Sequence, residues 1–354
     1  IDEETFWNGI RVHRVAIGGP PLFFMSGFLR GIRAPLDWLW QGWKLRHAVS
    51  KLHARQPFDV IQYASFTAPA LFRLKDVPAV VRLSSYEPMW QEGERVERSL
   101  ARKMQERIER LALLRADALF SPSHLVAGVA AEHLGRMVKV IESPYAPTTD
   151  AVDERPRQEM LEGRRYLLFY GSLGVIKGCE TIAKIIRPLL ESHPNLGFVF
   201  AGKDLGYRGQ PMMQYIWESA GHCRGRVLYL GKMHHGQLLP VVRHALGVVL
   251  PSRVDNLPNT CIEAMAESKV VVGTLGTSFE QLIEDGVSGL LCPPDDASGL
   301  RAAIERLLAM SQPQREDMGA AARSRIASLS SPKVVSELID LYLQVGSGRG
   351  KWRR

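Results

Sequence analysis

The feature that most constrains the fold is a repeated alternation of short apolar segments, typical of strands, with longer segments that have helical periodicity. From Phe58 the strand-like pieces are FDVIQYAS, PAVVRLSS, ADALFSPS and VKVIESP. Between them we predict a short helical piece, a long charged helix over about 93–116 and a helix over about 124–134. The strands are apolar throughout, as in a parallel sheet covered on both faces. This part is therefore predicted to be a doubly wound α/β domain.

The alternation stops over 148–164, where YAPTTDAVDERPRQEMLEGRR is rich in proline and charge and is predicted to be a linker. It then resumes with YLLFYG, LGFVFAG, RVLYLG, LGVVLPS, KVVVGTLG and GLLCPP, each followed by a helical pattern. We predict two Rossmann-like domains, over 1–147 and 165–330, and a C-terminal helix with a basic tail over 331–354. A chain of 354 residues is long enough for two cores.

Composition excludes several classes of protein. With 45% hydrophobic and 23% charged residues, the chain is globular rather than disordered. No apolar run approaches the roughly 18–20 residues of a spanning helix. The 4 cysteines are far apart and form no C-x-x-C pair, so we expect neither a disulfide framework nor a metal site, and we expect a cytoplasmic setting. The net charge of +8 leaves nucleic acid, anionic membrane headgroups and a phosphorylated small substrate as partners.

In doubly wound sheets, ligands bind beyond the carboxyl ends of the strands. The loop YGSLGVIKGCE follows the first strand of the second domain. Its glycines Gly171, Gly174 and Gly178 would let the backbone approach a ligand, and Lys177 stands just before a helix start. This pattern indicates a diphosphate site, with a tight turn and a surface lysine as the alternative.

The stretch VDNLPNTCIEAMAES follows the strand LGVVLPS. Asn256, Pro258 and Asn259 favour a helix start. Unpaired amides from about Asn259 to Cys261 would carry partial positive charge and form a second anion seat. The carboxylates of Asp255 and Glu263 suit the recognition of hydroxyl groups, although a solvated loop acid and a surface glutamate are the alternative. Two anion seats with two carboxylates indicate a nucleotide sugar.

The segments YGSLGVIKG, FVFAGKD, VLYLGKM, VVLPSRVDNLPNTCIEAMAE and FEQLIEDGVSGLLCPPDD resemble the donor domain of the family 4 retaining glycosyltransferases. That family has an acid, seven intervening residues and the glutamate of an E-A-M or E-A-L helix. Asp255 and Glu263 have this spacing, with aspartate in place of the commoner glutamate. The resemblance covers about 58–343 and is best over 166–308.

The resemblance implies the GT-B fold, in which two Rossmann-like domains face each other across a cleft. It implies a retaining hexosyltransferase that moves sugar from a UDP- or GDP-sugar to a lipid-linked or polysaccharide acceptor, without a cofactor. Fixed donors at the diphosphate would make a metal unnecessary, in agreement with a sequence that has no D-x-D pair. A lipid-linked acceptor would bring the protein to the inner face of the membrane.

Carried over position by position, the resemblance assigns the catalytic roles to three residues. Lys177 would bind the diphosphate, Glu263 the ribose hydroxyls and Asp255 the transferred sugar. Amides of the glycine loop and of the helix start would assist, the backbone after Asp255 would hold the sugar, and the loop after VLYLG would lie near the base. These further donor-binding positions are Gly171, Ser172, Lys232, Met233, Asn256, Leu257, Asn259 and Thr260.

The sequence departs from the family at three places. Ser172 stands where the family usually has arginine, so one diphosphate cation is missing. The strand that usually ends in a histidine ends VVRLSSYEP, which puts Ser84 or Ser85 on the acceptor side, with Arg82 or Glu87 to compensate. The family also has a strand, a glycine-rich loop, a helix and a second strand before a segment like NGIRVHRV. We expect the N-terminal domain to lack these elements and the chain to transfer poorly without them.

Other conspicuous residues have structural interpretations. His124, His234 and His235 are expected to be polar residues at helix starts, rather than metal ligands or a catalytic pair. The tryptophans of PLDWLWQGWKLRHAV are expected in the core, with Trp40 and Trp43 on one helix face and Trp38 apart from Trp43. The alternative is a membrane-facing helix with four cations near the headgroups: Arg30, Arg33, Lys44 and Arg46.

Three functions stay open at this point. The first is the sugar transferase. The second is a non-catalytic nucleotide-sugar binding protein or an inactive fragment of such an enzyme, which Ser172, Ser84 and the expected missing start would favour. The third is a nucleic-acid binder, for which the net charge is the only argument.

Overall fold

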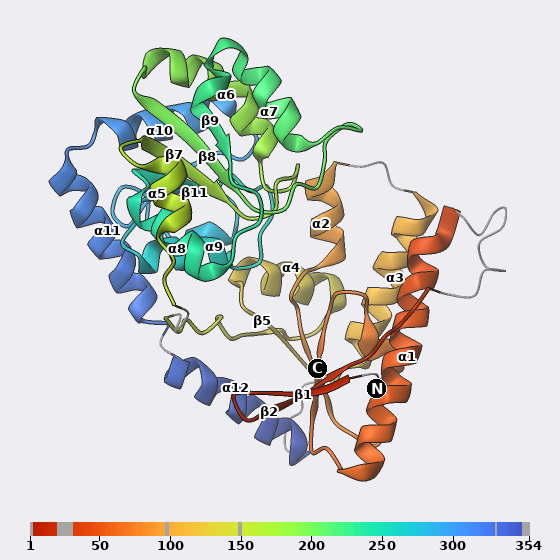
Figure 1. Ribbon diagram of the computed structural model, residues 1–354. Coiled ribbons are helices and arrows are strands. Elements are labelled where there is room, and N and C mark those ends of the chain that lie inside the picture. The colour runs from red at the N-terminus through yellow and green to blue at the C-terminus, as the bar shows by residue number, and fades with distance from the viewer. Residues whose placement is uncertain (1–2, 20–30, 96–98, 148–150, 330, 349–354) are drawn as a thin grey trace. The chain divides into compact units, whose positions relative to one another are not determined.

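A computed structural model describes residues 3–19, 31–95, 99–147, 151–329 and 331–348 of the chain (Figure 1). The chain forms two compact units. One consists of Ile1–Glu142 together with Val335–Arg354, and the other of Ser143–Val334. Each unit has its own sheet and its own core.

The unit Ser143–Val334 is built on a six-stranded parallel sheet of order β12-β11-β10-β7-β8-β9. Its strands are β7 (Arg165–Tyr170), β8 (Leu196–Ala201), β9 (Val227–Tyr229), β10 (Gly247–Val249), β11 (Val271–Thr274) and β12 (Leu290–Cys292). The helical segments are α5 (Arg155–Leu161), α6 (Cys179–Ser192), α7 (Met212–Ala220), η4 (Gly221–Arg226), α8 (His235–His244), α9 (Asn259–Ala266), η5 (Ser278–Gln281), α10 (Ala297–Ala309) and α11 (Gln312–Ala327).

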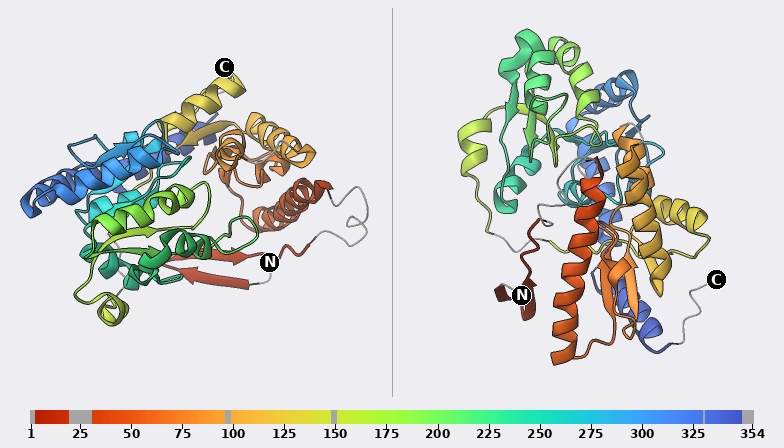
Figure 2. Two further views of the ribbon diagram at one scale, coloured as in Figure 1. Left: turned by 90° about the horizontal axis from the view of Figure 1, so that it is seen from above. Right: turned by 90° about the vertical axis from the view of Figure 1, so that its right-hand side faces the viewer.

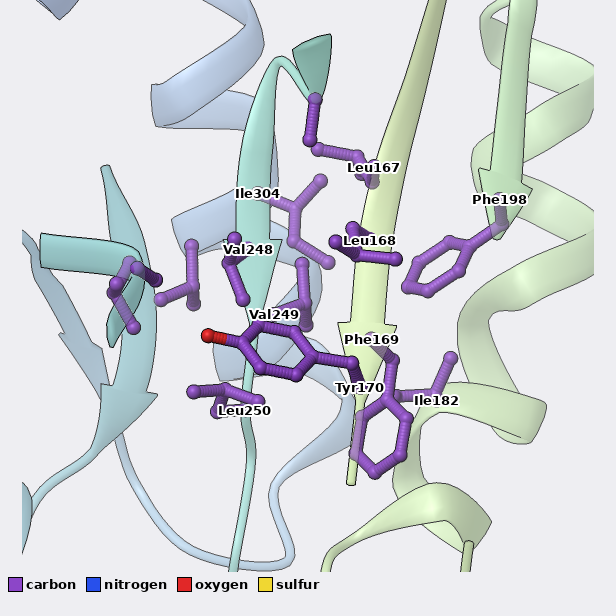
Figure 3. Packing of buried hydrophobic residues seen from close by; sticks show 14 of the residues in the cluster. Leu167, Leu168, Phe169, Tyr170, Ile182, Phe198, Val248, Val249, Leu250 and Ile304 are labelled. Carbon is purple, nitrogen blue, oxygen red and sulfur yellow. The ribbon is translucent and has the colours of Figure 1, made fainter. Parts of the chain in front are cut away.

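The strand order reverses between β7 and β10, so the loops that leave these two neighbouring strands lie side by side. α6 packs against α7 and α10, whereas α9 packs against α11 (Figure 1). Figure 3 shows the core at this point of the sheet, where side chains of three neighbouring strands meet: Leu167, Leu168 and Phe169 of β7, Phe198 of β8, and Val248 and Val249 of β10. The strands are buried on both faces, which explains their uninterrupted apolar sequences.

The other unit has a four-stranded parallel sheet of order β3-β4-β5-β6 and a separate antiparallel pair, β1 with β2. The strands are β1 (Glu3–Trp7), β2 (Ile10–Arg14), β3 (Ile61–Ala64), β4 (Ala79–Arg82), β5 (Ala118–Ser121) and β6 (Lys139–Val140). The helices are α1 (Arg33–Arg55), η3 (Pro69–Phe72), α2 (Glu87–Glu94), α3 (Leu100–Arg115) and α4 (His124–Leu134). α1 and α3 lie side by side and both contact η3 (Figure 2).

The long charged helix predicted over about 93–116 is present as α3, but it begins at Leu100, and a separate helix, α2, ends at Glu94. Arg95 has a φ of 52° and ends α2, a conformation that does not continue a right-handed helix. The hydroxyl of Ser99 accepts a hydrogen bond from the amide of Arg102 at 3.3 Å and caps the start of α3. Two local signals, a left-handed residue and a serine cap, therefore divide a charged segment that has helical periodicity throughout.

The segment predicted as a linker, 148–164, contains the helix α5. Before this helix, the amide of Asp153 donates to the carbonyl of Gly236 in α8 at 3.0 Å. At the other end of the unit, helix α12 (Ser331–Gly346) passes from the second unit to the first, and the units divide at Val335. The hydroxyl of Tyr342 donates to Gln62 of β3, so the last helix is joined to the N-terminal sheet rather than standing apart as a tail.

In the part of the chain that the structure describes, no helix has the length and apolar character needed to cross a membrane. Trp38 is buried, as expected for a core tryptophan, but Trp43 is 47% exposed and stacks on Trp40 with ring centroids 5.3 Å apart. Arg30 and the basic end of the chain from 349 lie outside the described residues.

Candidate functional site

The glycine loop after β7 is held close to the end of β10. Gly178 has a φ of +73°, and a Cβ atom at this position would lie 1.9 Å from the carbonyl oxygen of Pro251. Gly171 has a φ of +128°, which is also a conformation that disfavours side chains. At Gly178, both the backbone torsion and the lack of space therefore require glycine. The close approach at this residue brings the segment that carries Lys177 against the loop after β10.

The two functional loops are joined by an ion pair. Lys177 Nζ lies 2.5 Å from Asp255 Oδ2, and Asp255 is only 8% exposed. The second carboxylate oxygen, Asp255 Oδ1, accepts from the amide of Asn256 at 3.1 Å. On the backbone side, the hydroxyl of Ser278 donates to the carbonyl of Asp255 at 2.7 Å. The structure thus brings together the lysine and the acid that the sequence assigns to the diphosphate and to the sugar.

The start of α9 lies beside the glycine loop. The hydroxyl of Tyr170, the last residue of β7, donates to the carbonyl of Thr260 at 2.5 Å. A Cβ atom on Gly171 would lie 3.7 Å from Thr260 Cγ2, an ordinary van der Waals contact. One expectation needs correction, because the amide of Cys261 is not unpaired: it donates to the carbonyl of Pro258 at 3.0 Å. Any amide contribution to an anion seat therefore comes from Asn259 and Thr260.

The residue before this helix start is conformationally unusual. Leu257 has a φ of 54°, although it is not glycine, and its side chain is 2% exposed. Such a left-handed conformation costs roughly 1–2 kcal/mol and persists where the surrounding structure imposes it. Burial of the leucine side chain provides that constraint and places the backbone of Asn256 and Leu257 beside Asp255.

Glu263 lies one turn into α9 and lines a pocket of about 330 Å³ together with Asn259, which belongs to the first turn of the same helix. Its carboxyl is half-buried, and burial raises its pKa above the usual value, while the neighbouring His235 lowers it in part. The remaining lining residues are Pro144, Tyr145, Ala146, His235 and Ile262. The pocket offers a buried carboxylate and an imidazole next to the proposed diphosphate seat.

His235 begins α8, as the sequence predicts, but the prediction that it is exposed is wrong. It is half-buried in the wall of the Glu263 pocket, while His234 is exposed and caps α8. No motif in the sequence could have indicated this, because α8 follows β9 at the edge of the sheet, whereas Glu263 follows β10. Only the crossover between these strands brings the two residues together.

The other predicted donor-side residues lie on loops that follow β7 and β9. Ser172 is half-buried between Gly171 and Leu173 in the glycine loop. Lys232 is exposed and Met233 packs against the core, both on the loop after β9. That loop adjoins the end of β8, where the amide of Gly202 donates to the carbonyl of Gly231 at 2.7 Å.

The predicted acceptor-side residues follow β4 in the other unit. The hydroxyl of Ser65 donates to the carbonyl of Ser85 at 2.6 Å, and its oxygen lies 3.4 Å from that of Ser84. Glu87 begins α2, and its amide donates to the carboxylate of the buried Glu109 at 2.8 Å. Burial raises the pKa of Glu87 and, more strongly, that of Glu109. The three predicted residues therefore share one edge of the N-terminal sheet.

The residues that the structure describes contain no group of three or more His, Cys, Asp or Glu side chains suited to a metal ion. All four cysteines in this part are buried and unpaired with one another. Lys177 and the start of α9 can hold an anion between them. The carboxylates on either side can accept hydrogen bonds from hydroxyl groups.

Two family models match the chain, and between them they cover both units. The model described as "Glycosyl transferases group 1" matches residues 151–325, and the model described as "Glycosyl transferase 4-like domain" matches residues 2–145. Among similar proteins is the alpha-D-kanosaminyltransferase of Streptomyces kanamyceticus, 26% identical over 295 residues, which are 80% of this chain and 75% of that protein. The D-inositol 3-phosphate glycosyltransferase of Corynebacterium jeikeium is 29% identical over 204 residues, 56% of this chain and 48% of that protein.

Solved structures share the fold. Sucrose-phosphate synthase from Thermosynechococcus elongatus matches with a TM-score of 0.72 at 19% identity, over 87% of this chain and 79% of that chain. Anabaena HepE, solved in complex with UDP and glucose, matches with a TM-score of 0.67 at 16% identity, over 92% of this chain and 84% of that one. Both units are Rossmann-like, as in these GT-B structures. The chain therefore belongs to the group 1 glycosyltransferases, the family 4 type with the GT-B fold.

Proposed function

We propose that this glycosyltransferase moves a hexose from a UDP- or GDP-sugar to a lipid-linked or polysaccharide acceptor, with retention of the anomeric configuration. The donor part of this proposal is supported by three elements that meet where the strand order of the C-terminal sheet reverses. Lys177 pairs with Asp255, the hydroxyl of Tyr170 donates to the carbonyl of Thr260, and Glu263 follows on the same helix. A nucleotide sugar has its groups in the matching order: ribose, diphosphate and hexose.

The proposed chemistry follows from the charges. Cleavage of the anomeric bond leaves negative charge on the departing diphosphate, and fixed donors aimed at that charge lower the barrier. Lys177 and the amides of Asn259 and Thr260 supply such donors. Lys177 Nζ lies 2.5 Å from Asp255 Oδ2, so the lysine charge is paired with this carboxylate. The donor would exchange this contact for its diphosphate at Lys177, while Asp255 turns to the hydroxyls of the hexose.

Glu263 and His235 would hold the nucleoside end. Burial raises the pKa of Glu263, and its ionised form would accept hydrogen bonds from the two ribose hydroxyls. Transfer would need no cofactor and no fixed metal, because the cationic lysine and the helix start provide the charge stabilisation that a metal gives in other transferases.

Relatives support the substrate class without identifying the acceptor. Structures with similar folds include HepE with UDP and glucose and an Escherichia coli trehalose-6-phosphate protein bound to UDP-2-fluoro glucose. The net charge of +8 favours an acceptor carried on an anionic lipid or at an anionic membrane face. The sites of Ser84, Ser85 and Glu87, after β4, are the proposed acceptor contacts.

A non-catalytic nucleotide-sugar binder is the second candidate, and Ser172 favours it. Serine is neutral, whereas the family usually has a cationic arginine at this position. Of the side chains proposed to bind the diphosphate leaving group, only Lys177 would then carry a positive charge. Such a protein would keep donor affinity but lose turnover.

A donor panel separates these functions. The protein is incubated with UDP-glucose, UDP-N-acetylglucosamine, GDP-mannose and GDP-fucose, and both thermal stability and release of nucleoside diphosphate are measured, with and without an acceptor lipid extract. Release together with a donor-dependent thermal shift supports the transferase. A thermal shift without release supports the binder, and neither response with any donor rejects the nucleotide-sugar site. DNA affinity that falls steeply with salt concentration, without a donor-dependent shift in thermal stability, would favour the nucleic-acid binder.

A further inference from the structure

A second cavity lies entirely within the N-terminal unit and has no role in the donor site. It has a volume of about 890 Å³, and its walls come from α1, η3, the end of α3 and the segment after α4. We call it the basic pocket and define it by its nine lining residues: Trp43, Arg46, Leu71, Phe72, Arg73, Lys75, Leu114, Arg115 and Arg136.

The basic pocket lies at the amino-terminal edge of the sheet. Arg115 precedes β5, which begins at Ala118, and Arg136 precedes β6, which begins at Lys139. Arg73 pairs with Asp117, whose carboxylate also accepts from the amide of the first residue of β4 at 2.9 Å. The proposed acceptor residues instead follow the carboxyl end of β4. The pocket is therefore on the opposite edge from the chemistry, and a ligand there would not be the acceptor in transfer.

The walls of the pocket are fixed by close packing and by arginine contacts. A Cβ atom on Gly42 would lie 2.7 Å from Phe72 Cδ2, so glycine lets α1 approach η3. Arg46 Nη1 donates to the carbonyls of Phe72 and Arg73 at 3.1 and 2.8 Å. Arg115 Nη1 donates to the carbonyl of Leu71 at 2.8 Å. These bonds hold both guanidinium groups at the rim in defined positions.

The same bonds leave donors for a ligand. Within the residues that the structure describes, Arg46 and Arg115 use only Nη1, so their Nη2 and Nε groups make no hydrogen bond there, and both side chains are exposed. Lys75 is exposed and makes no ion pair in the same residues. The lining includes five cationic and no acidic side chains, and one of the cations, Arg73, forms an ion pair with Asp117.

The other part of the lining is apolar and aromatic. Trp43 is 47% exposed, and its ring stacks between those of Trp40 and His47, at centroid distances of 5.3 and 6.0 Å. Leu114, which is 36% exposed, lines the same cavity. A purely ionic ligand would leave these apolar surfaces in water, whereas a ligand with an apolar group would cover them.

We propose that the basic pocket binds a phosphate ester that carries an apolar group. The guanidinium fork of arginine matches the oxygens of a phosphate, and a cluster of cationic side chains in a pocket with no acidic lining residue attracts a dianion. Trp43 and Leu114 cover the apolar group. A lipid headgroup at a membrane surface and a free aryl or alkyl phosphate share this chemistry.

The experiment measures binding to two probes that differ in source. The first probe is phenyl phosphate, titrated by calorimetry with UDP present to occupy the donor site. The second is a vesicle of phosphatidylcholine with or without phosphatidylglycerol, measured by co-sedimentation. Binding of phenyl phosphate supports a free ester as ligand, and binding of phosphatidylglycerol vesicles alone supports a lipid headgroup.

Two variants test the pocket itself. We expect Arg46→Gln with Arg115→Gln to weaken binding tenfold or more, and Lys75→Gln to weaken it a few-fold. Lys75→Gln breaks no hydrogen bond within the described residues, so it keeps the test valid if the double variant is unstable. The control is Arg107→Gln with Arg110→Gln, which removes the same charge from the exposed face of α3 outside the pocket. Lack of binding to both probes by the unaltered protein, or equal loss in the control, would overturn the proposal.

Discussion

At the scale of single residues, donor affinity is expected to depend on two charged groups. Lys177→Ala and Glu263→Ala should each weaken donor binding by an order of magnitude or more, since a hydrogen bond to a charged group contributes about 1.5–3 kcal/mol. Calorimetric titration with the donor from the panel checks this. Lys184→Ala on α6 and Glu316→Ala on α11 are matched controls, because both side chains are exposed and lie outside the site. Unchanged donor affinity in both site variants would remove the assignment.

The protonation of Glu263 gives a pH dependence with a defined sign. Burial raises the pKa of this carboxyl in the fold, so it takes up a proton at a higher pH than an exposed glutamate does. Ribose hydroxyls need the ionised form as acceptor, so donor affinity should fall as pH is lowered through the raised pKa of Glu263. Stability without donor should change with pH in the opposite direction to donor affinity. Because the pKa of Glu263 is higher in the folded than in the unfolded state, the free energy of unfolding should fall as pH rises from the unfolded-state pKa through the folded-state pKa.

Glu263→Gln separates this group from the other titrating groups. The amide has nearly the same shape and no charge, so the fall in affinity toward acid pH should disappear while the remaining affinity is lower at neutral pH. If Glu263→Gln keeps the same fall in donor affinity at acid pH, the titrating group is not Glu263.

At the scale of elements, two tyrosines of β7 provide a matched pair. Tyr170 donates to the carbonyl of Thr260 at 2.5 Å beside the site, and Tyr166 donates to the carbonyl of Val241 at 2.7 Å near the start of the strand. Tyr170→Phe and Tyr166→Phe should each lower the free energy of unfolding by about 1–3 kcal/mol, because both hydroxyls are buried. Only Tyr170→Phe should also weaken donor binding, since it releases the start of α9 from β7. Equal donor affinities in the two variants would show that this contact does not position the site.

The elements also show what a sequence can and cannot predict. The strands of the C-terminal sheet are buried on both faces, so they appear in the sequence as apolar runs that can be predicted as strands. The division between α2 and α3 depends on one left-handed residue and one serine cap, which periodicity does not detect. The place of His235 beside Glu263 depends on a crossover between strands, a property of topology that no local pattern contains.

At the scale of the whole molecule, two separate cores predict two unfolding transitions. One core belongs to Ser143–Val334 and the other to the N-terminal unit. The proposed donor site lies in the first of these, so a saturating donor should raise only the corresponding midpoint. At a free donor concentration 100 times Kd the gain is about 2.7 kcal/mol, on the order of 5–10 °C.

Removal of α12 tests the same division from the opposite side. From Val335 this helix belongs to the N-terminal unit, where Leu341 and Val345 are buried and Tyr342 donates to Gln62. A chain ended after 334 should lose stability in the N-terminal transition, because these apolar side chains and the hydrogen bond are gone, while the other transition and its donor-induced shift are kept. Differential scanning calorimetry of both chains, with and without donor, measures each transition. A single transition that shifts as a whole with donor, or loss of the donor shift in the shortened chain, would contradict the assignment of α12 and the independence of the two cores.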